Sequence, residues 1–195
     1  MSGRFTQVAL ESKAQKHDHI DIVFEDSILR YTDARRFGCF IWSSNPFKHP
    51  LLAALGPEPF SNEFSSEYVY RFISHRKVSI KVLLMNAAFV VGVGNIYASE
   101  SLFRAKIDPR RSANSLSKAE CEKLVNAVQV VLLEAIEKGG STLRDYALPD
   151  GDSGYFQHSF SVYARAGKPC CQCGTTITKI TQGQRSTFMC ANCQR

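Results

Sequence analysis

Four cysteines near the end of the printed sequence have the spacing of a metal site. They form two Cys-x2-Cys pairs, Cys170 with Cys173 and Cys190 with Cys193, and 16 residues separate the pairs. Each pair turns two thiolates toward one point, and two such pairs complete the tetrahedron that zinc prefers. The spacing therefore predicts one structural Zn²⁺ ion, bound by these four cysteines in a ribbon.

Disulfide bonds are the alternative role for these cysteines, and they have less support in the sequence. Disulfides belong to oxidising compartments, and Met1-Ser2-Gly3-Arg4-Phe5 lacks the apolar segment of a secretory signal, so we expect a cytoplasmic protein with reduced thiols. Cys171 stands inside the first pair and is predicted to be a bystander. Cys39 and Cys121 follow apolar patterns, which predicts that both are buried in a core.

The charge of the chain is concentrated at one end. The chain has 24 basic and 18 acidic side chains, and residues 161–195 contain five of the basic residues and no acidic residue. This segment suits an anionic partner, of which nucleic acid is the commonest, although charge alone is equally consistent with a solvated surface. The longest apolar stretch, Val82 to Val91, is too short to cross a bilayer. A membrane span is excluded.

The segment Gly92-Val93-Gly94-Asn95 begins like a dinucleotide-binding fingerprint. The sixth position is Tyr97 instead of glycine, and the segment before it is predicted to be helical, so that interpretation fails. A glycine turn at the start of a helix still lets backbone amides approach a phosphate. The spacing is equally consistent with a tight turn between helices that binds nothing.

The periodicity predicts strands first and helices later. Short strands are expected at residues 20–24, 28–31 and 38–42, in an antiparallel sheet. After the proline-rich stretch 43–59, helices are expected at 77–87, from about Asn95, and at 118–138. The last helix has a capping box, Ser117-x-x-Glu120, and a Gly139-Gly140 stop. Residues 145–158 are predicted to form a mobile loop.

Three segments, in the same order along the chain, resemble the bacterial formamidopyrimidine-DNA glycosylases. Residues 91–103, preceded by Lys81, resemble the helix-two-turn-helix, residues 33–38 resemble the lesion-probing loop, and the cysteine ribbon with residues 184–188 resembles the zinc finger. The related endonuclease VIII branch is the alternative. The Arg35-Arg36-Phe37 loop and residues 139–143 favour the first branch.

The resemblance implies an α+β fold with three parts. Residues 1–60 would be the C-terminal part of the catalytic β-domain, a partial antiparallel β-sandwich. Residues 61–160 would be the helix-two-turn-helix domain, and residues 161–195 the zinc ribbon. A monomer is expected where the β-domain is complete.

The resemblance also implies residues that bind DNA phosphates, which position a duplex without reading its sequence. They are His17, Lys81, Asn95 and Arg185. His17 and His19 could alternatively form a metal pair, but the sequence offers no third ligand beside them.

Further residues match the family's lesion contacts. Met1, Arg35 and Phe37 would fill the space left when a damaged nucleotide swings out of the duplex. Arg144 would belong to the loop that closes over the extruded base, at a position where the family commonly has lysine.

The resemblance fails at the catalytic group. In this family an N-terminal proline attacks the sugar C1′ and forms a Schiff base, assisted by a glutamate and a lysine. The printed chain starts with Met1-Ser2-Gly3-Arg4, which resembles a segment well inside the β-domain, so these three residues have no counterpart. We therefore expect an N-terminally truncated relative of these DNA glycosylase/AP lyases that binds oxidised-purine or abasic duplex DNA without cleaving it. The alternatives are a non-enzymatic damage-recognition module, an endonuclease VIII-like glycosylase and an RNA-binding zinc ribbon.

Overall fold

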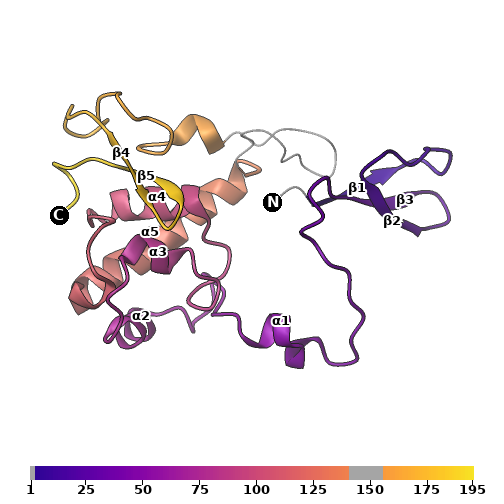
Figure 1. Ribbon diagram of the computed structural model, residues 1–195, viewed down its shortest axis with the longest axis horizontal. Helices are drawn as coiled ribbons and strands as arrows, with labels where there is room; N and C mark the ends of the chain where they lie inside the picture. Colours follow the sequence, from indigo (N-terminus) through magenta and orange to yellow (C-terminus); the bar gives the residue numbers. More distant parts are fainter. Residues whose placement is uncertain (1–2, 141–155) are drawn as a thin grey trace. The chain divides into compact units, whose positions relative to one another are not determined.

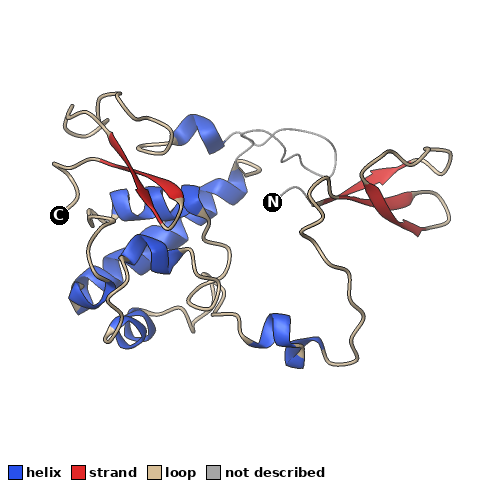
Figure 2. Ribbon diagram, in the orientation of Figure 1, coloured by secondary structure: helices blue, strands red, loops and turns tan. Residues whose placement is uncertain are grey.

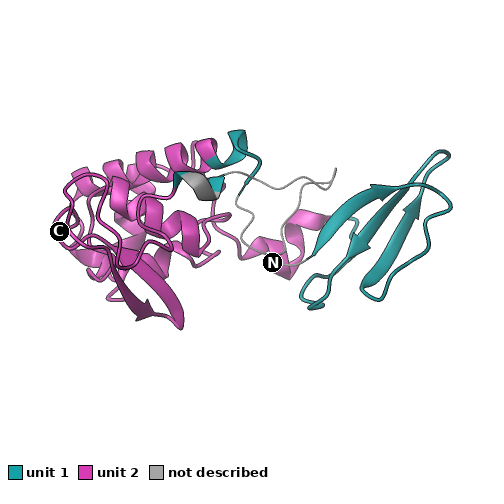
Figure 3. Cartoon of the chain, turned by 90° about the horizontal axis from the view of Figure 1, so that it is seen from above, with its two compact units in different colours: residues 1–44, 135–159 teal, residues 45–134, 160–195 magenta. Residues whose placement is uncertain are grey.

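The computed structural model describes residues 3–140 and 156–195 and divides the chain into two compact units. Unit 1 comprises residues 1–44 and 135–159, and unit 2 comprises residues 45–134 and 160–195 (Figure 3). No helix in the part of the chain that is described is long and apolar enough to cross a membrane. These two units do not correspond to the three predicted parts with boundaries at residues 60 and 160, so that division stays a prediction.

Unit 1 contains a three-stranded antiparallel sheet in the order β1-β3-β2 (Figures 1 and 2). Its strands are β1 (Arg4–Val8), β2 (Asp18–Val23) and β3 (Ile28–Thr32), which confirms the strands predicted at 20–24 and 28–31. The central strand contains a buried guanidinium, Arg30, which donates to Asp21 and to two backbone carbonyls of the β1–β2 connection. These bonds fix that connection against the sheet.

The third predicted strand is wrong. Residues 38–42 form no strand, and the side chains of Phe40, Ile41 and Trp42 are 62%, 52% and 86% exposed. An extended segment needs a neighbouring strand for its backbone hydrogen bonds, and residues 38–42 pair with neither edge strand of the sheet, β1 or β2. Cys39, which was expected in a core, is exposed for the same reason, whereas Cys121 is buried as predicted.

Unit 2 is built from helices around one apolar core. The helices are α1 (Pro50–Ala53), α2 (Ser66–Ile73), α3 (Ile80–Leu84), α4 (Asn95–Arg104) and α5 (Lys118–Glu137), with short 3-10 turns at Pro46–Lys48 and Ala113–Ser115. The end of α5, from residue 135, and a further 3-10 turn at Phe156–Ser159 belong to unit 1. The core includes Phe64, Phe89, Leu102 and Leu124, all at most 2% exposed. Its packing sets the positions of α3 and α4.

Helix α3 is shorter than the helix predicted at 77–87. The backbone carbonyls of Arg76 and Val78 accept hydrogen bonds from Asn114 and Ala113, at 3.0 and 2.9 Å. Since these groups bond to a distant segment, the helix begins only after Ser79. This pairing could not be read from local periodicity.

Helix α5 follows its predicted limits closely. The Ser117 hydroxyl accepts the N–H of Glu120, and the Glu120 carboxylate accepts the N–H of Ser117, which is the reciprocal pattern of a capping box. Arg111 also donates to Glu120 and lowers the pKa of that carboxyl to about 2. Gly139 and Gly140, both with positive φ, end the helix.

The last part of unit 2 is a two-stranded antiparallel ribbon of β4 (Thr178–Gln182) and β5 (Arg185–Met189). Phe188 of β5 and Ile177, just before β4, pack with Phe103 of α4 and with Val162 in a second small core. The ribbon therefore rests on the same helix that begins at Asn95.

Candidate nucleic-acid interface and zinc centre

The four predicted cysteines converge at the base of the ribbon. All four sulfur atoms lie within 4.8 Å of one another, with Sγ of Cys170 3.9 Å from that of Cys193, and Cys173 3.5 Å from Cys190. Tetrahedral zinc with Zn–S bonds of about 2.3 Å requires sulfur atoms roughly 3.8 Å apart. The cluster has the size and the chemistry of a structural Zn²⁺ site, as the spacing predicted.

Without a cation, the four sulfurs of this cluster cannot all be thiolates side by side. Burial raises the pKa of Cys193 to about 12, and hydrogen bonds from Thr175 lower the pKa of Cys173 to about 5. A divalent cation removes this conflict because it holds all four sulfurs as thiolates. Cys171 is exposed and lies outside the cluster, which fits a bystander.

A buried carboxylate on α4 joins this helix to the segment that leads into the ribbon. Glu100 is 1% exposed, and its two oxygens accept the backbone N–H groups of Ser161, Val162 and Tyr163 at 2.8–3.0 Å. Three donors for one carboxylate make a strong charge-assisted attachment. Glu100 was not among the residues singled out from the sequence, because nothing local marks a glutamate whose partners lie 61–63 positions away.

Two further polar contacts attach the ribbon to the helices. The amide of Asn95, the first residue of α4, donates to the carbonyl of Ser186 on β5 at 2.9 Å. The side chain of Gln194, 2% exposed, accepts from the N–H of Cys190 and donates to the carbonyl of Ile107. Through these bonds the metal site, α4 and the hairpin form one body.

The joining of hairpin and helices brings together Lys81, Asn95 and Arg185, three of the residues predicted to bind phosphate. Lys81 and Arg185 form a small cationic cluster. Lys81 on α3 is fully buried, and its ammonium has no hydrogen-bond partner among residues 3–140 and 156–195. Burial, together with the nearby charge of Arg185, lowers the pKa of Lys81 to about 8. A buried, unpaired ammonium beside a second cation is unfavourable unless an anion joins them.

The start of α4 is open to such an anion. Gly92 has φ +76°, and a Cβ placed on Gly92 or Gly94 would contact nothing within 4 Å among the described atoms. No side chain caps the first turn of α4, so its N–H groups carry the positive end of the helix dipole unshielded by a cap. Glycine at 92 is required by the backbone angle, and the open space leaves room for a ligand.

The other predicted site residues lie in unit 1 or outside the described chain. His17 is exposed in the β1–β2 connection just before β2, and Arg35 and Phe37 are exposed in the loop after β3. Met1 and Arg144 fall outside the described residues, as does most of the predicted loop at 145–158. The roles of these residues stay predictions.

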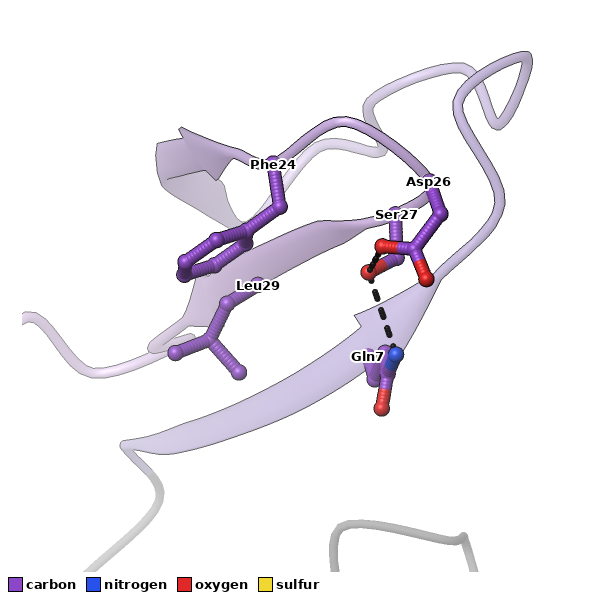
Figure 4. A pocket seen from close by; sticks show the side chains of 5 residues that line it. All are labelled: Gln7, Phe24, Asp26, Ser27 and Leu29. Atoms are coloured by element: carbon purple, nitrogen blue, oxygen red, sulfur yellow. Dashed lines mark hydrogen bonds between the residues drawn. The ribbon is translucent and has the colours of Figure 1, made fainter.

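A hollow of about 300 Å³ lies on the three-stranded sheet, lined by Gln7, Phe24, Asp26, Ser27 and Leu29 (Figure 4). The Gln7 amide donates to the Ser27 hydroxyl, which donates to Asp26, so the polar atoms there bond to one another. None of the predicted site residues lines it.

Comparison with known proteins decides the family. Residues 55–147 match the formamidopyrimidine-DNA glycosylase H2TH domain, and residues 167–195 match the zinc finger found in FPG and IleRS. The formamidopyrimidine-DNA glycosylase of Neisseria meningitidis is 53% identical over 94% of this chain and 67% of its own length. That of Proteus mirabilis is 50% identical over the whole chain and 71% of its own length.

The chain belongs to the formamidopyrimidine-DNA glycosylase family, which acts in DNA repair. Two solved members of the family have the same fold over 100% of this chain. The Thermus thermophilus MutM (Fpg) protein has a TM-score of 0.88 at 39% identity, and the chain covers 73% of it. Lactococcus lactis Fpg in complex with abasic-site DNA has a TM-score of 0.89 at 33% identity, and the chain covers 72% of it. The α+β fold and the zinc finger inferred from the resemblance are confirmed.

Replacing a zinc ligand tests the metal centre. We expect Cys173→Ser to lower the zinc content from one ion per chain to near zero and to unfold the ribbon, because three thiolates leave the tetrahedron incomplete. Zinc released by a thiol-reactive reagent and measured with a chromogenic chelator gives the content directly. Cys171→Ser is the matched control and should retain its zinc; loss of zinc in the control alone would contradict this assignment.

Proposed function

We propose that the chain binds duplex DNA that contains an oxidised purine or an abasic site, and that it holds a backbone phosphate with Lys81, Arg185 and the first turn of α4. The observation that carries this proposal is the buried Lys81 ammonium without a partner beside Arg185. Arg185 is exposed and would meet the phosphate from solvent, whereas the buried Lys81 ammonium would have to turn toward it. The similar Lactococcus lactis Fpg complexes, which contain Fapy-dG or abasic-site DNA, support the choice of ligand.

Unit 1 would supply the contacts at the lesion itself. Phe37 is 72% exposed, and the guanidinium carbon of Arg35 lies 5.2 Å from its ring centroid. An exposed aromatic ring beside a cation suits insertion where a base has left the stack. His17 would bind a further phosphate, and Met1 and Arg144 would act at the lesion as their positions in the family imply. We propose that the protein acts in the bacterial cytoplasm, at the nucleoid, because its DNA partner would be there.

The polypeptide of these 195 residues would bind this DNA without excising the base. A primary or secondary amine beside the sugar must form the Schiff base, and the family's proline, glutamate and lysine have no counterpart among these residues. The first proline in the printed sequence is Pro46, in the stretch that opens unit 2.

The salt dependence of binding tests the phosphate site. We expect Arg185→Ala to weaken binding to damaged and undamaged duplexes alike and to reduce the slope of log affinity against log salt by about 1. Lys123→Ala is the matched control, because this exposed lysine of α5 lies away from the phosphate site. It lines a hollow together with Arg104, which ends α4 about 15 Å from Asn95 at its start. Fluorescence anisotropy over a salt series measures both slopes. Equal slopes for the two variants would refute the site.

The pKa of Lys81 predicts how binding depends on pH. Only the charged form attracts phosphate, and in the free protein this form disappears as the pH rises through about 8. We therefore expect the affinity for duplex DNA to fall by up to about tenfold between pH 7 and pH 9, with proton uptake on binding. Lys81→Met should bind more weakly at pH 7 and show a flat profile. A steep profile in this variant would assign the titration to another group.

Covalent trapping tests the absence of cleavage chemistry. Borohydride reduces a Schiff base to a stable adduct, so abasic duplex DNA incubated with the 195-residue polypeptide and borohydride should yield no shifted band. The homologous protein from Proteus mirabilis serves as the comparison for trapping. An adduct with the shorter polypeptide would reveal a nucleophile among its own residues.

A further inference from the structure

Asp33 stands where the chain leaves the sheet and enters the exposed loop 34–37. It follows the last residue of β3 and is 1% exposed. Its backbone N–H donates to the carbonyl of His17 at 3.0 Å, and its carbonyl accepts from Nε2 of His19 at 2.9 Å. The start of the loop is thus fixed to the residues around the beginning of β2.

The carboxylate of Asp33 fixes the other side of the loop. One oxygen accepts the N–H of Arg35 at 3.2 Å, and the other accepts the N–H of Gly38 at 2.8 Å and the hydroxyl of Tyr31 at 3.2 Å. Arg35 belongs to the loop, Gly38 follows it, and Tyr31 lies on β3 before it. One side chain therefore ties both ends of the loop to the sheet.

Two backbone features show that the loop is held in a particular shape. A Cβ on Gly38 would lie 1.8 Å from the Tyr31 hydroxyl oxygen, so only glycine can approach this closely. Arg36 has φ +53°, which non-glycine residues rarely adopt without compensating contacts. The hydrogen bonds to Asp33 provide that compensation.

The tip that this arrangement presents is exposed. Residues 34–37 are all exposed, and Phe37 packs only partly, with its ring under the Arg35 guanidinium. A carboxylate so close to a DNA-binding loop would repel phosphates, which is a cost for binding. The cost is reduced here because three hydrogen-bond donors face the Asp33 carboxylate.

We propose that Asp33 is a positioning residue for lesion recognition: with Tyr31 and Gly38 it holds the tip of the loop in the shape that inserts Arg35 and Phe37 into damaged DNA. This inference rests on the proposed function. The loop is ordered before DNA binds, so the binding energy of the tip is not spent on ordering it. Loss of the clamp then reduces preference for damaged DNA and leaves phosphate binding by unit 2 unchanged.

The test compares Asp33→Asn with Asp26→Asn, which replaces an exposed carboxylate in the β2–β3 turn of the same sheet. Affinities for an abasic-site duplex and for the undamaged duplex are measured by anisotropy. Asp33→Asn should lower the ratio of the two affinities about tenfold, as Phe37→Ala should, with no change for the undamaged duplex. Asp26→Asn should leave the ratio as it is.

A measurement without DNA examines the clamp itself. Trypsin cleaves after Arg35 and Arg36, and a released loop is a better substrate than a fixed one. Cleavage at these two bonds should be at least tenfold faster in Asp33→Asn, with cleavage in unit 2 unchanged. If Asp33→Asn unfolds the sheet, Tyr31→Phe removes one of the three donors and should produce smaller changes in the same direction.

The outcomes separate the two proposals. Unchanged proteolysis and an unchanged affinity ratio would overturn the role of Asp33. Faster proteolysis with an unchanged ratio would overturn its part in lesion recognition. A wild-type chain that binds neither duplex would overturn the proposed function, whereas faster cleavage at the loop would still support the clamp.

Discussion

The attachment of the ribbon to α4 through the buried Glu100 carboxylate is the constraint on which the candidate interface depends. Zinc can shape the ribbon, but it cannot orient the ribbon against the helices. Glu100 does so because its oxygens accept three consecutive backbone N–H groups, those of residues 161–163, in the segment that leads to the cysteines and to β4. A carboxylate removed from water is tolerated only where donors replace its hydration, so this contact has few alternative arrangements. The position of Arg185 relative to Asn95 and Lys81 follows from it.

The cationic cluster shows the opposite situation, a buried charge that the protein leaves without a partner. Lys81 is surrounded by protein, and its lowered pKa reflects the energetic cost of that position. Two partly buried arginines in the same unit are paired, Arg111 with Glu120 and Arg104 with Glu134. The contrast favours a functional origin for the unpaired ammonium, since a phosphate would supply the missing negative charge.

In both units, buried polar groups hold exposed ones in place. Glu100 and Gln194 are inaccessible and fix the ribbon, while Arg185 at its hairpin faces solvent. Asp33 is likewise inaccessible and holds the loop from which Phe37 projects. This division fits DNA binding by preformed surfaces, in which the groups that touch the duplex are supported by hydrogen bonds that water cannot reach.

The amino-acid sequence by itself determined the zinc ligands, the family, the extent of α5 and two of the three strands of the sheet, because each of these depends on residue types at short, regular spacing. Other features depended on partners far along the chain: the shortening of α3, the exposure of residues 38–42 and the roles of Glu100 and Gln194. The role of Asp33 depended on a loop that closes back on its own strand. Only the tertiary structure decided these, since a hydrogen bond between distant segments leaves no periodic signal in either one.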